Sequence, residues 1–151
     1  MPIPLQVGRF HKHDLRTQFS ALPFRVVQDK PQVLLITSRR SRRWIVPKGW
    51  PMPGKSPAEC AAIEAYQEAG VKGKVYDLCL GVFSYTKEFD KGDDLPCAAM
   101  VYPIKVKRLM VDYPEKNERK RKWFSLKKAA RRVAEPELAA ILTNFDPKIL
   151  R

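Results

Sequence analysis

Short apolar runs separated by polar segments dominate the first third of the chain and predict strands. Residues 24–27 and 33–37 are mainly apolar, and the polar segment between them has the composition of a turn. Residues 44–46 form a third short apolar run, which a proline ends. Because residues 48–55 contain two glycines and two prolines, we expect a loop there.

The next segment carries the signals of a helix that begins after Ser56 and ends near Ala69. Ser56 suits the N-cap, Pro57 suits the first helical position, and Glu59 completes the S-x-x-E pattern of a capping box. Gly70 suits the left-handed position that follows a helix. Five alanines share one narrow face of this helix and would let a neighbour approach closely, namely Ala58, Ala61, Ala62, Ala65 and Ala69.

The rest of the chain alternates strand patterns with charged loops and ends in two helical patterns. We expect strands at 71–80, 82–86, 97–109 and 123–124, and helices at 125–133 and 136–145. Pro103 lacks an amide hydrogen, so an edge position or a bulge is expected there. Together these elements predict an α/β (α+β) fold with a mixed sheet, in a single domain over residues 1–151 with a flexible terminus to about residue 18.

Composition adds that the protein is strongly basic. Its 151 residues include 29 lysines and arginines but 16 aspartates and glutamates, which gives a net charge of +13. The excess lies at the two ends, since residues 51–100 carry 8 acidic and 5 basic side chains. Such a charge favours polyanionic partners, such as nucleic acid, nucleotides, polyphosphates or an anionic membrane, unless it serves solubility alone.

Two further features predict a cytoplasmic protein. No apolar run approaches the roughly 18 residues of a membrane span, and the N-terminal segment lacks the apolar core of a signal peptide. The cysteines Cys60, Cys79 and Cys97 form no CxxC pair, so we expect reduced, buried thiols instead of a disulfide framework.

Glu64 and Glu68 are the first candidates for chemistry. They lie four residues apart on the predicted helix, so their carboxylates stack one turn apart beside the alanine face. Two such carboxylates can bind a hard divalent cation, but glutamates on helices are also commonly solvated charges. The spacing alone leaves both interpretations open.

The residues around this pair bear a family resemblance. The segment 44–71, WIVPKGWPMPGKSPAECAAIEAYQEAGV, resembles the Nudix hydrolase box, G-x5-E-x7-R-E-U-x-E-E-x-G-U with U apolar. The matching positions are Gly49, Glu64, Glu68, Gly70 and Val71. The approach W-x-V-P-K-G is similar to that of members acting on diadenosine polyphosphates or inositol pyrophosphates. The resemblance implies a Nudix-type α/β/α sandwich with a mixed β-sheet.

Three positions depart from the box pattern. Lys55 and Ile63 replace a glutamate and an arginine that pair in the family and brace the loop before the helix. The joint loss is physically coherent, because an arginine would repel Lys55 whereas Ile63 does not. Gln67 replaces a glutamate that often supplies a metal oxygen, and its amide offers a carbonyl oxygen without charge. We therefore expect weakened Mg²⁺ affinity.

The resemblance implies a metal-dependent hydrolase with Mg²⁺ or Mn²⁺ as cofactor. The implied metal ligands are Gly49, through its carbonyl, with Glu64, Gln67 and Glu68. Glu64 and Glu68 are also the implied catalytic residues, as metal ligand or as base towards the attacking water. Many relatives use one more glutamate from a loop outside the box, and the candidates here are Glu88, Glu115 and Glu118.

Basic residues before the box favour a substrate with several phosphates. Arginine forks match phosphate oxygens, and lysine supplies a compact charge. A tryptophan directly after the box glycine is placed to stack on a base. The candidate substrate-binding residues are Arg39, Arg40, Arg42, Arg43, Lys48 and Trp50. The alternative for the arginines is a loop that is basic for solubility only.

Two classes of function therefore remain. The favoured one is hydrolysis of a nucleoside- or inositol-linked diphosphate or polyphosphate by a weakened box, with a phosphorylated small molecule as the partner. The alternative is a catalytically inactive Nudix-fold module that binds a nucleotide, polyphosphate or RNA. A dedicated nucleic-acid-binding protein is less favoured, because charge alone supports it. No membrane partner is expected, and the sequence leaves the oligomeric state open.

Overall fold

A computed structural model describes residues 16–87 and 94–150 of the protein. The strands of this part are β1 (Arg16–Val27), β2 (Lys30–Thr37), β3 (Trp44–Ile45), β4 (Lys48–Gly49), β5 (Val71–Val75), β6 (Gly81–Lys87), β7 (Leu95–Leu109) and β8 (Arg121–Ser125). The helices are α1 (Pro57–Ala69), α2 (Leu126–Arg132) and α3 (Pro136–Asn144), followed by a 3-10 turn, η1 (Pro147–Ile149). All the strands join one mixed sheet with the central order β3-β2-β1-β7-β5, in which β1 and β7 run parallel.

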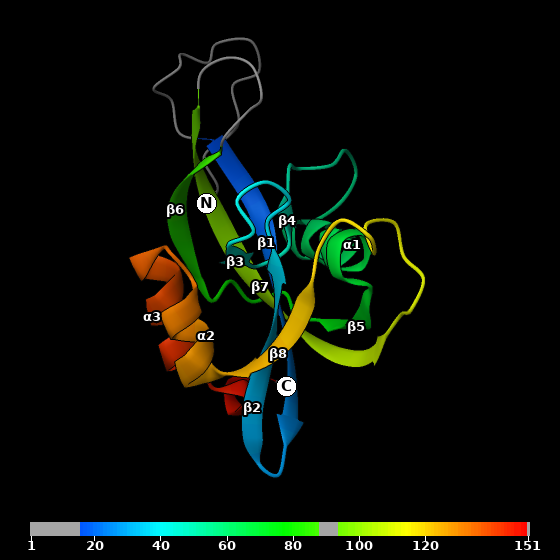
Figure 1. Cartoon of the computed structure of the whole chain (residues 1–151), viewed down its shortest axis with the longest axis vertical. Helices are drawn as coiled ribbons and strands as arrows, with labels where there is room; N and C mark the ends of the chain where they lie inside the picture. Colours follow the sequence, from blue (N-terminus) through cyan, green and yellow to red (C-terminus); the bar gives the residue numbers. More distant parts are fainter. Residues whose placement is uncertain (1–15, 88–93, 151) are drawn as a thin grey trace.

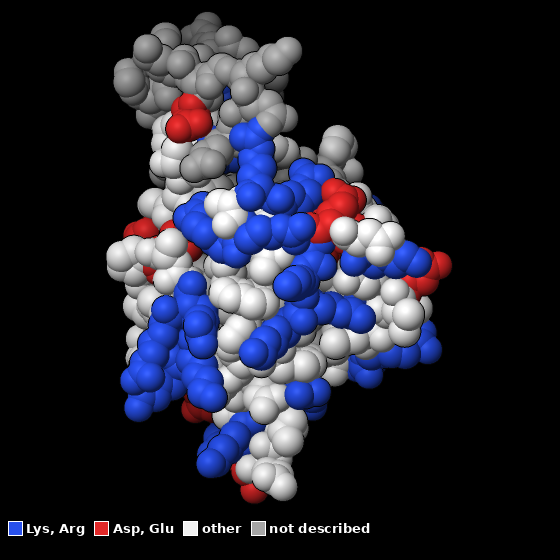
Figure 2. All heavy atoms as spheres, in the orientation of Figure 1, with Lys and Arg blue, Asp and Glu red and all other residues white. Residues whose placement is uncertain are grey.

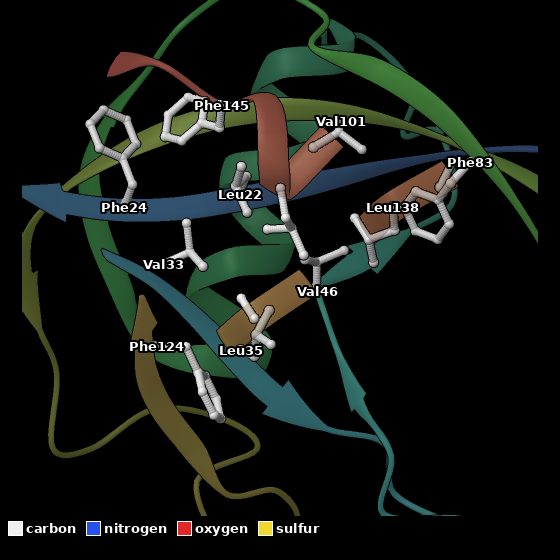
Figure 3. Close-up of a cluster of buried hydrophobic side chains, with 13 residues drawn as sticks. Leu22, Phe24, Val33, Leu35, Val46, Phe83, Val101, Phe124, Leu138 and Phe145 are labelled. Atoms are coloured by element: carbon white, nitrogen blue, oxygen red, sulfur yellow. The ribbon is translucent and has the colours of Figure 1, made fainter. Parts of the chain in front are cut away.

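Helices cover both sides of this sheet, which gives three layers (Figure 1). Because side chains alternate along a strand, neighbouring residues of β1 and β2 enter different cores. Leu22 and Leu35 belong to the core that packs against α2 and α3, shown in Figure 3. Ala21 and Leu34 belong to the core that packs against α1. The α/β/α arrangement confirms the predicted fold class.

Helix α1 follows the sequence signals closely. The Ser56 hydroxyl accepts from the Glu59 amide at 3.2 Å, and the Glu59 carboxylate accepts from the Ser56 amide at 2.9 Å. Gly70 ends the helix with φ 68°. Four of the five alanines are buried against the sheet, and Ala62 is partly buried. The Arg121 guanidinium also donates to the Ala69 carbonyl at 2.7 Å, so both ends of α1 are held.

Several strand predictions were wrong in extent. β1 begins at Arg16, although the terminus was expected to be flexible to about residue 18 and the first strand to begin at residue 24. Its first half mixes polar and apolar side chains, which hid the strand signal, yet β7 and β4 pair with it on its two sides. The predicted loop after Pro47 contains β4, and the expected strand 71–80 ends at Val75.

Pro103 lies inside β7 and not on an edge of the sheet. β7 pairs with β1 along one side, while its other side changes partner from β6 to β5 near this residue. Val101 pairs with β6 and Ile104 with β5, so Pro103 falls at the junction between the two partners. The missing amide hydrogen of Pro103 therefore falls where β7 changes its partner strand, and not at an edge of the sheet.

Cys60 and Cys97 are buried free thiols, as expected, whereas Cys79 is exposed because it lies in the turn between β5 and β6. Within residues 16–87 and 94–150, no helix is long and apolar enough to cross a membrane. The residues preceding β1, including His11 and His13, lie outside the described part of the chain.

Candidate active site

The paired glutamates of α1 face strand β4. Glu68 is 8% exposed, and Glu64 is partly buried beside Gly49. A methyl group added at Gly49 would collide with the Glu64 carboxylate, so only glycine lets this carboxylate lie against the strand. The box glycine therefore sets how closely the acidic face of α1 approaches the sheet.

Burial shapes the electrostatics of both carboxylates. Burial raises the pKa of Glu68 to about 7, and the nearby Arg119 opposes that rise. Burial also raises the pKa of Glu64, and the negative charge of Glu115 adds to it. One Glu68 oxygen accepts from the Lys48 backbone amide at 3.3 Å. Burial therefore disfavours the charged form of both carboxylates.

Glu115 brings a third carboxylate to this pair. It lies in the segment between β7 and β8, where its backbone amide donates to the Gln67 carbonyl at 3.1 Å. Its side chain lines one hollow together with Glu64 and Glu68. Glu118 instead pairs with Arg39 at 3.1 Å in an exposed position. The third candidate glutamate of the sequence analysis, Glu88, lies outside the described residues.

Arg119 is a site residue that sequence reasoning missed. Its guanidinium donates to Glu115 at 2.9 Å and to the Thr37 carbonyl at 3.1 Å, and lies 3.8 Å from a Glu68 oxygen. The side chain is 8% exposed. In the sequence Arg119 belongs to a charged run of seven residues, Lys116–Lys122. Only the fold shows that its side chain is buried while its neighbours are solvated.

Two adjoining hollows meet at the carboxylates. The larger, of about 610 Å³, is lined by predicted substrate-binding residues, namely Arg39, Arg40, Arg43 and Lys48, and by Arg119. The smaller, of about 350 Å³, includes Gly49, Trp50 and the three carboxylates among its lining residues. Lys48, Glu68, Lys87 and Glu115 line both hollows. The basic loop (residues 39–43) and the acidic face of α1 therefore line two neighbouring hollows that share these four residues.

Two predicted site residues lie outside these hollows. Arg42 donates to the Glu118 carbonyl at 3.4 Å and has φ 56°, which turns the basic loop at this point. The Gln67 side chain is exposed, while its carbonyl accepts from Glu115. Neither side chain is among the lining residues of the two hollows.

Lys48 connects the two hollows. Its ammonium group lies 4.7 Å from the centre of the Tyr85 ring, which favours a cation over the ring face. Burial lowers the pKa of Lys48 to about 8, and the negative charge of Glu68 opposes that shift. The Tyr85 hydroxyl in turn donates to the Gln18 side chain. The ammonium group of Lys48 therefore lies beside the Tyr85 ring and lines both hollows next to the carboxylates.

The donor set fits a hard divalent cation. Among the described residues, no group of three or more His, Cys, Asp or Glu side chains is already gathered closely enough to hold a metal ion. However, burial raises the pKa of both Glu64 and Glu68, so a cation between them would offset an unfavourable negative charge. Mg²⁺ commonly uses one or two carboxylates, with water and substrate phosphates completing its ligands.

Comparison with known proteins decides the family. The family model of the NUDIX domain matches residues 17–145. The chain belongs to the Nudix family. This Nudix chain is 33% identical over 128 residues to diphosphoinositol polyphosphate phosphohydrolase 2 of Rattus norvegicus, covering 83% of the chain and 67% of the relative. It is 34% identical over 128 residues to diphosphoinositol polyphosphate phosphohydrolase 3-beta of Homo sapiens, covering 83% and 74%.

Solved structures agree on the fold. The Ap4A hydrolase of C. elegans superposes with a TM-score of 0.64 at 18% identity, over 90% of this chain and 99% of that one. The NUDIX domain of NrtR from Shewanella oneidensis, solved with ADP ribose, gives a TM-score of 0.58 at 13% identity, over 85% and 84%. The family resemblance and its subgroup, predicted from residues 44–71, are confirmed.

Proposed function

We propose that this Nudix protein hydrolyses a phosphoric anhydride bond in a small molecule that carries several phosphates. The observation that carries the proposal is that Glu68 lines a hollow together with arginines and Lys48, while Glu64 lines the adjoining hollow. Two curated relatives are named as diphosphoinositol polyphosphate phosphohydrolases, which supports an inositol-linked polyphosphate as the substrate class. A nucleoside-linked polyphosphate is the other candidate substrate of this proposal.

A divalent cation, Mg²⁺ or Mn²⁺, is part of this proposal. Glu64, Glu68 and the Gly49 carbonyl would hold it, with Glu115 as a further carboxylate in the same hollow. When bound, such an ion supplies Lewis-acid polarisation of a phosphoryl oxygen. The exposed Gln67 side chain contributes no charge to this set of ligands. We therefore expect the set to bind metal more weakly than one with a glutamate at position 67.

The remaining chemistry comes from side chains of the chain itself. Arg39, Arg40 and Arg43 present guanidinium groups to the larger hollow, where they can hold phosphate oxygens and orient the substrate. Lys48 places a positive charge between these phosphates and the carboxylates. Glu64 and Glu68 would share two roles, ligating the metal and accepting the proton of the attacking water.

An inactive binding module is the second candidate, and Arg119 favours it. Its guanidinium already lies beside Glu68 and Glu115, so part of the charge that a metal would supply comes from the protein. In this alternative the arginine-lined hollow binds a polyphosphate without metal and without turnover.

One experiment separates the two candidates. The protein is incubated with a diphosphoinositol polyphosphate, with Ap4A and with nucleoside diphosphates in Mg²⁺ or Mn²⁺, and phosphate-containing products are measured. We expect turnover of at least one substrate, which Glu68→Gln abolishes and Asp112→Asn, at an exposed position, leaves unchanged. No turnover of any substrate, together with tight binding that needs no metal, would support the inactive module.

A further inference from the structure

Part of the positive charge of this protein lies outside the hydrolytic site. Figure 2 shows lysines and arginines over the basic loop, over β8 and over α2, with few acidic side chains among them. Six exposed residues at β8 and α2 form what we call the β8–α2 basic face, namely Lys120, Lys122, Lys127, Lys128, Arg131 and Arg132. None of the six is among the residues that line the two hollows.

These six charges have no acidic partner within residues 16–87 and 94–150. The arginines of the basic loop differ, because Arg39 pairs with Glu118 and Arg43 lies 4.0 Å from Glu135. Within the basic face, the Lys122 ammonium lies 5.5 Å from the centre of the Phe124 ring. The face therefore carries a positive charge that the fold itself does not neutralise.

Helix α2 is organised to present this charge outwards. The Ser125 hydroxyl caps the helix, Ala129 is fully buried, and Leu126 and Ala130 pack against the core. The four cations of α2 therefore occupy its solvent side as two like-charged pairs at i,i+4 spacing. Each such pair weakens a helix by a few tenths of a kcal/mol, while the helix dipole favours Arg131 and Arg132 in the last turn. The two effects oppose each other, so the four charges as a group do little to stabilise the helix.

The surroundings of the face restrict the kind of partner. A membrane-binding helix or the centre of a protein interface needs apolar side chains beside its charges. The exposed large apolar residues of the described chain lie elsewhere, none of them on β8 or α2. A small phosphorylated ligand needs a concave site, whereas these six residues line neither hollow. An extended chain of phosphates fits the face best.

We propose that the β8–α2 basic face binds the phosphodiester backbone of nucleic acid without sequence preference, independently of the hydrolytic site. Phosphate contacts by lysine and arginine supply this kind of binding and release counterions from the nucleic acid. The proposal does not rest on the proposed hydrolysis.

Salt dependence provides the direct test. We measure binding of an oligouridine 20-mer by fluorescence anisotropy between 50 and 200 mM salt. Six contacts to a single strand predict a slope of about −4 in log affinity against log salt, a loss of roughly 300-fold over this range. The variant with Lys127, Lys128, Arg131 and Arg132 all replaced by glutamine keeps two contacts, and we expect a slope of about −1.5.

A matched control removes the same charge from the other end of the sheet. Lys72, Lys74, Lys105 and Lys107 on β5 and β7 are exposed, so their glutamine variants lose four charges as well. Glutamine has a helix propensity close to those of lysine and arginine, so α2 is expected to remain folded, which circular dichroism checks. The control should bind with the slope of the unmodified protein.

Three outcomes would overturn the proposal. One is an α2 variant that binds the oligonucleotide with the original slope, and another is a control variant that loses as much affinity as the α2 variant. The third is binding of phosphatidylserine vesicles, but not of the oligonucleotide, in an α2-dependent way. Tripolyphosphate is added to fill the hydrolytic site, and the oligonucleotide should stay bound at 50 mM salt. Displacement of the oligonucleotide by tripolyphosphate at equal ionic strength would contradict independent sites.

Discussion

Glu64 and Gly49 show how closely the chemistry of this site depends on single residues. The Glu64 carboxylate occupies the space that a side chain at position 49 would need. It can lie there only because residue 49 is a glycine. Arg119 acts in the opposite way, because it fills the space between Glu68 and Glu115 with a positive charge. The box pattern indicated Gly49 and Glu64 as site residues, but their close approach was not predicted from it. The contact of Arg119 with Glu68 could not be predicted either, since residues 68 and 119 meet only through the fold.

Replacing Gly49 by alanine tests the close approach of Glu64 to this residue. The added methyl group must displace the Glu64 carboxylate, and misplacing a reacting group by about 1 Å can cost about 100-fold in rate. We expect a loss of that order in kcat/KM, measured as product release. Gly54→Ala in the same loop is the control for a general loss of stability, because φ 74° strains an alanine there while no heavy atom lies within 4 Å of its added carbon. Equal losses in the two variants would contradict the explanation.

Replacing Arg119 by glutamine tests its contact with the carboxylates. Two buried carboxylates then lose their cation, so the free energy of unfolding should fall by about 3 kcal/mol, measured by urea denaturation. Mg²⁺ should recover part of that loss, because it supplies the missing charge, and Arg119→Lys should lose less. A glutamine variant that Mg²⁺ leaves equally unstable would show that these carboxylates do not bind the metal.

At the scale of elements, α1 could be predicted almost to the residue, whereas the strands around it could not. Its caps, its proline and its alanine face all act locally, so the sequence contains them as short patterns. β1 and β4 depend on partners distant in sequence, and their mixed or very short segments carry little local signal. The same holds for the site residues. Glu64 and Glu68 were indicated by their spacing on one helix, whereas the choice of Glu115 over Glu118 depends on contacts between distant segments.

The two N-capping serines offer a matched pair of variants. Ser56→Ala and Ser125→Ala each remove a side-chain cap, from α1 and α2 respectively, and each should cost about 1 kcal/mol in the free energy of unfolding. Only Ser56→Ala should also reduce kcat/KM, because α1 carries the carboxylates. Activity assays beside thermal melts check this expectation. An equal loss of activity in both variants would indicate a general effect of stability.

At the scale of the whole molecule, one sheet separates two cores and places the site at the contact of α1 with β4. The α/β/α class and the mixed sheet were predicted from the order of elements, because that order follows from periodicity. The parallel pairing of β1 with β7 could not be predicted from the sequence, because the paired residues lie some eighty positions apart and no local pattern indicates their contact.

Metal binding should be visible in the stability of the whole fold. At ten times its Kd, Mg²⁺ is expected to raise the free energy of unfolding by about 1.4 kcal/mol and the melting temperature by about 4 °C. Differential scanning calorimetry at constant ionic strength measures the shift. The double variant Glu64→Gln with Glu68→Gln should show no shift, and an undiminished response would place the cation elsewhere.

The segment between β7 and β8 has a consequence for how such a protein can diversify. It supplies both Glu115 and Arg119, and it is tied to α1 through the Gln67 carbonyl and to β2 through the Thr37 carbonyl. A change of side chains there would alter the charge around the paired carboxylates, and it would cost stability where it removes the contacts with α1 or β2. We therefore expect new substrate preferences to arise from exchanges in this connection that keep those contacts.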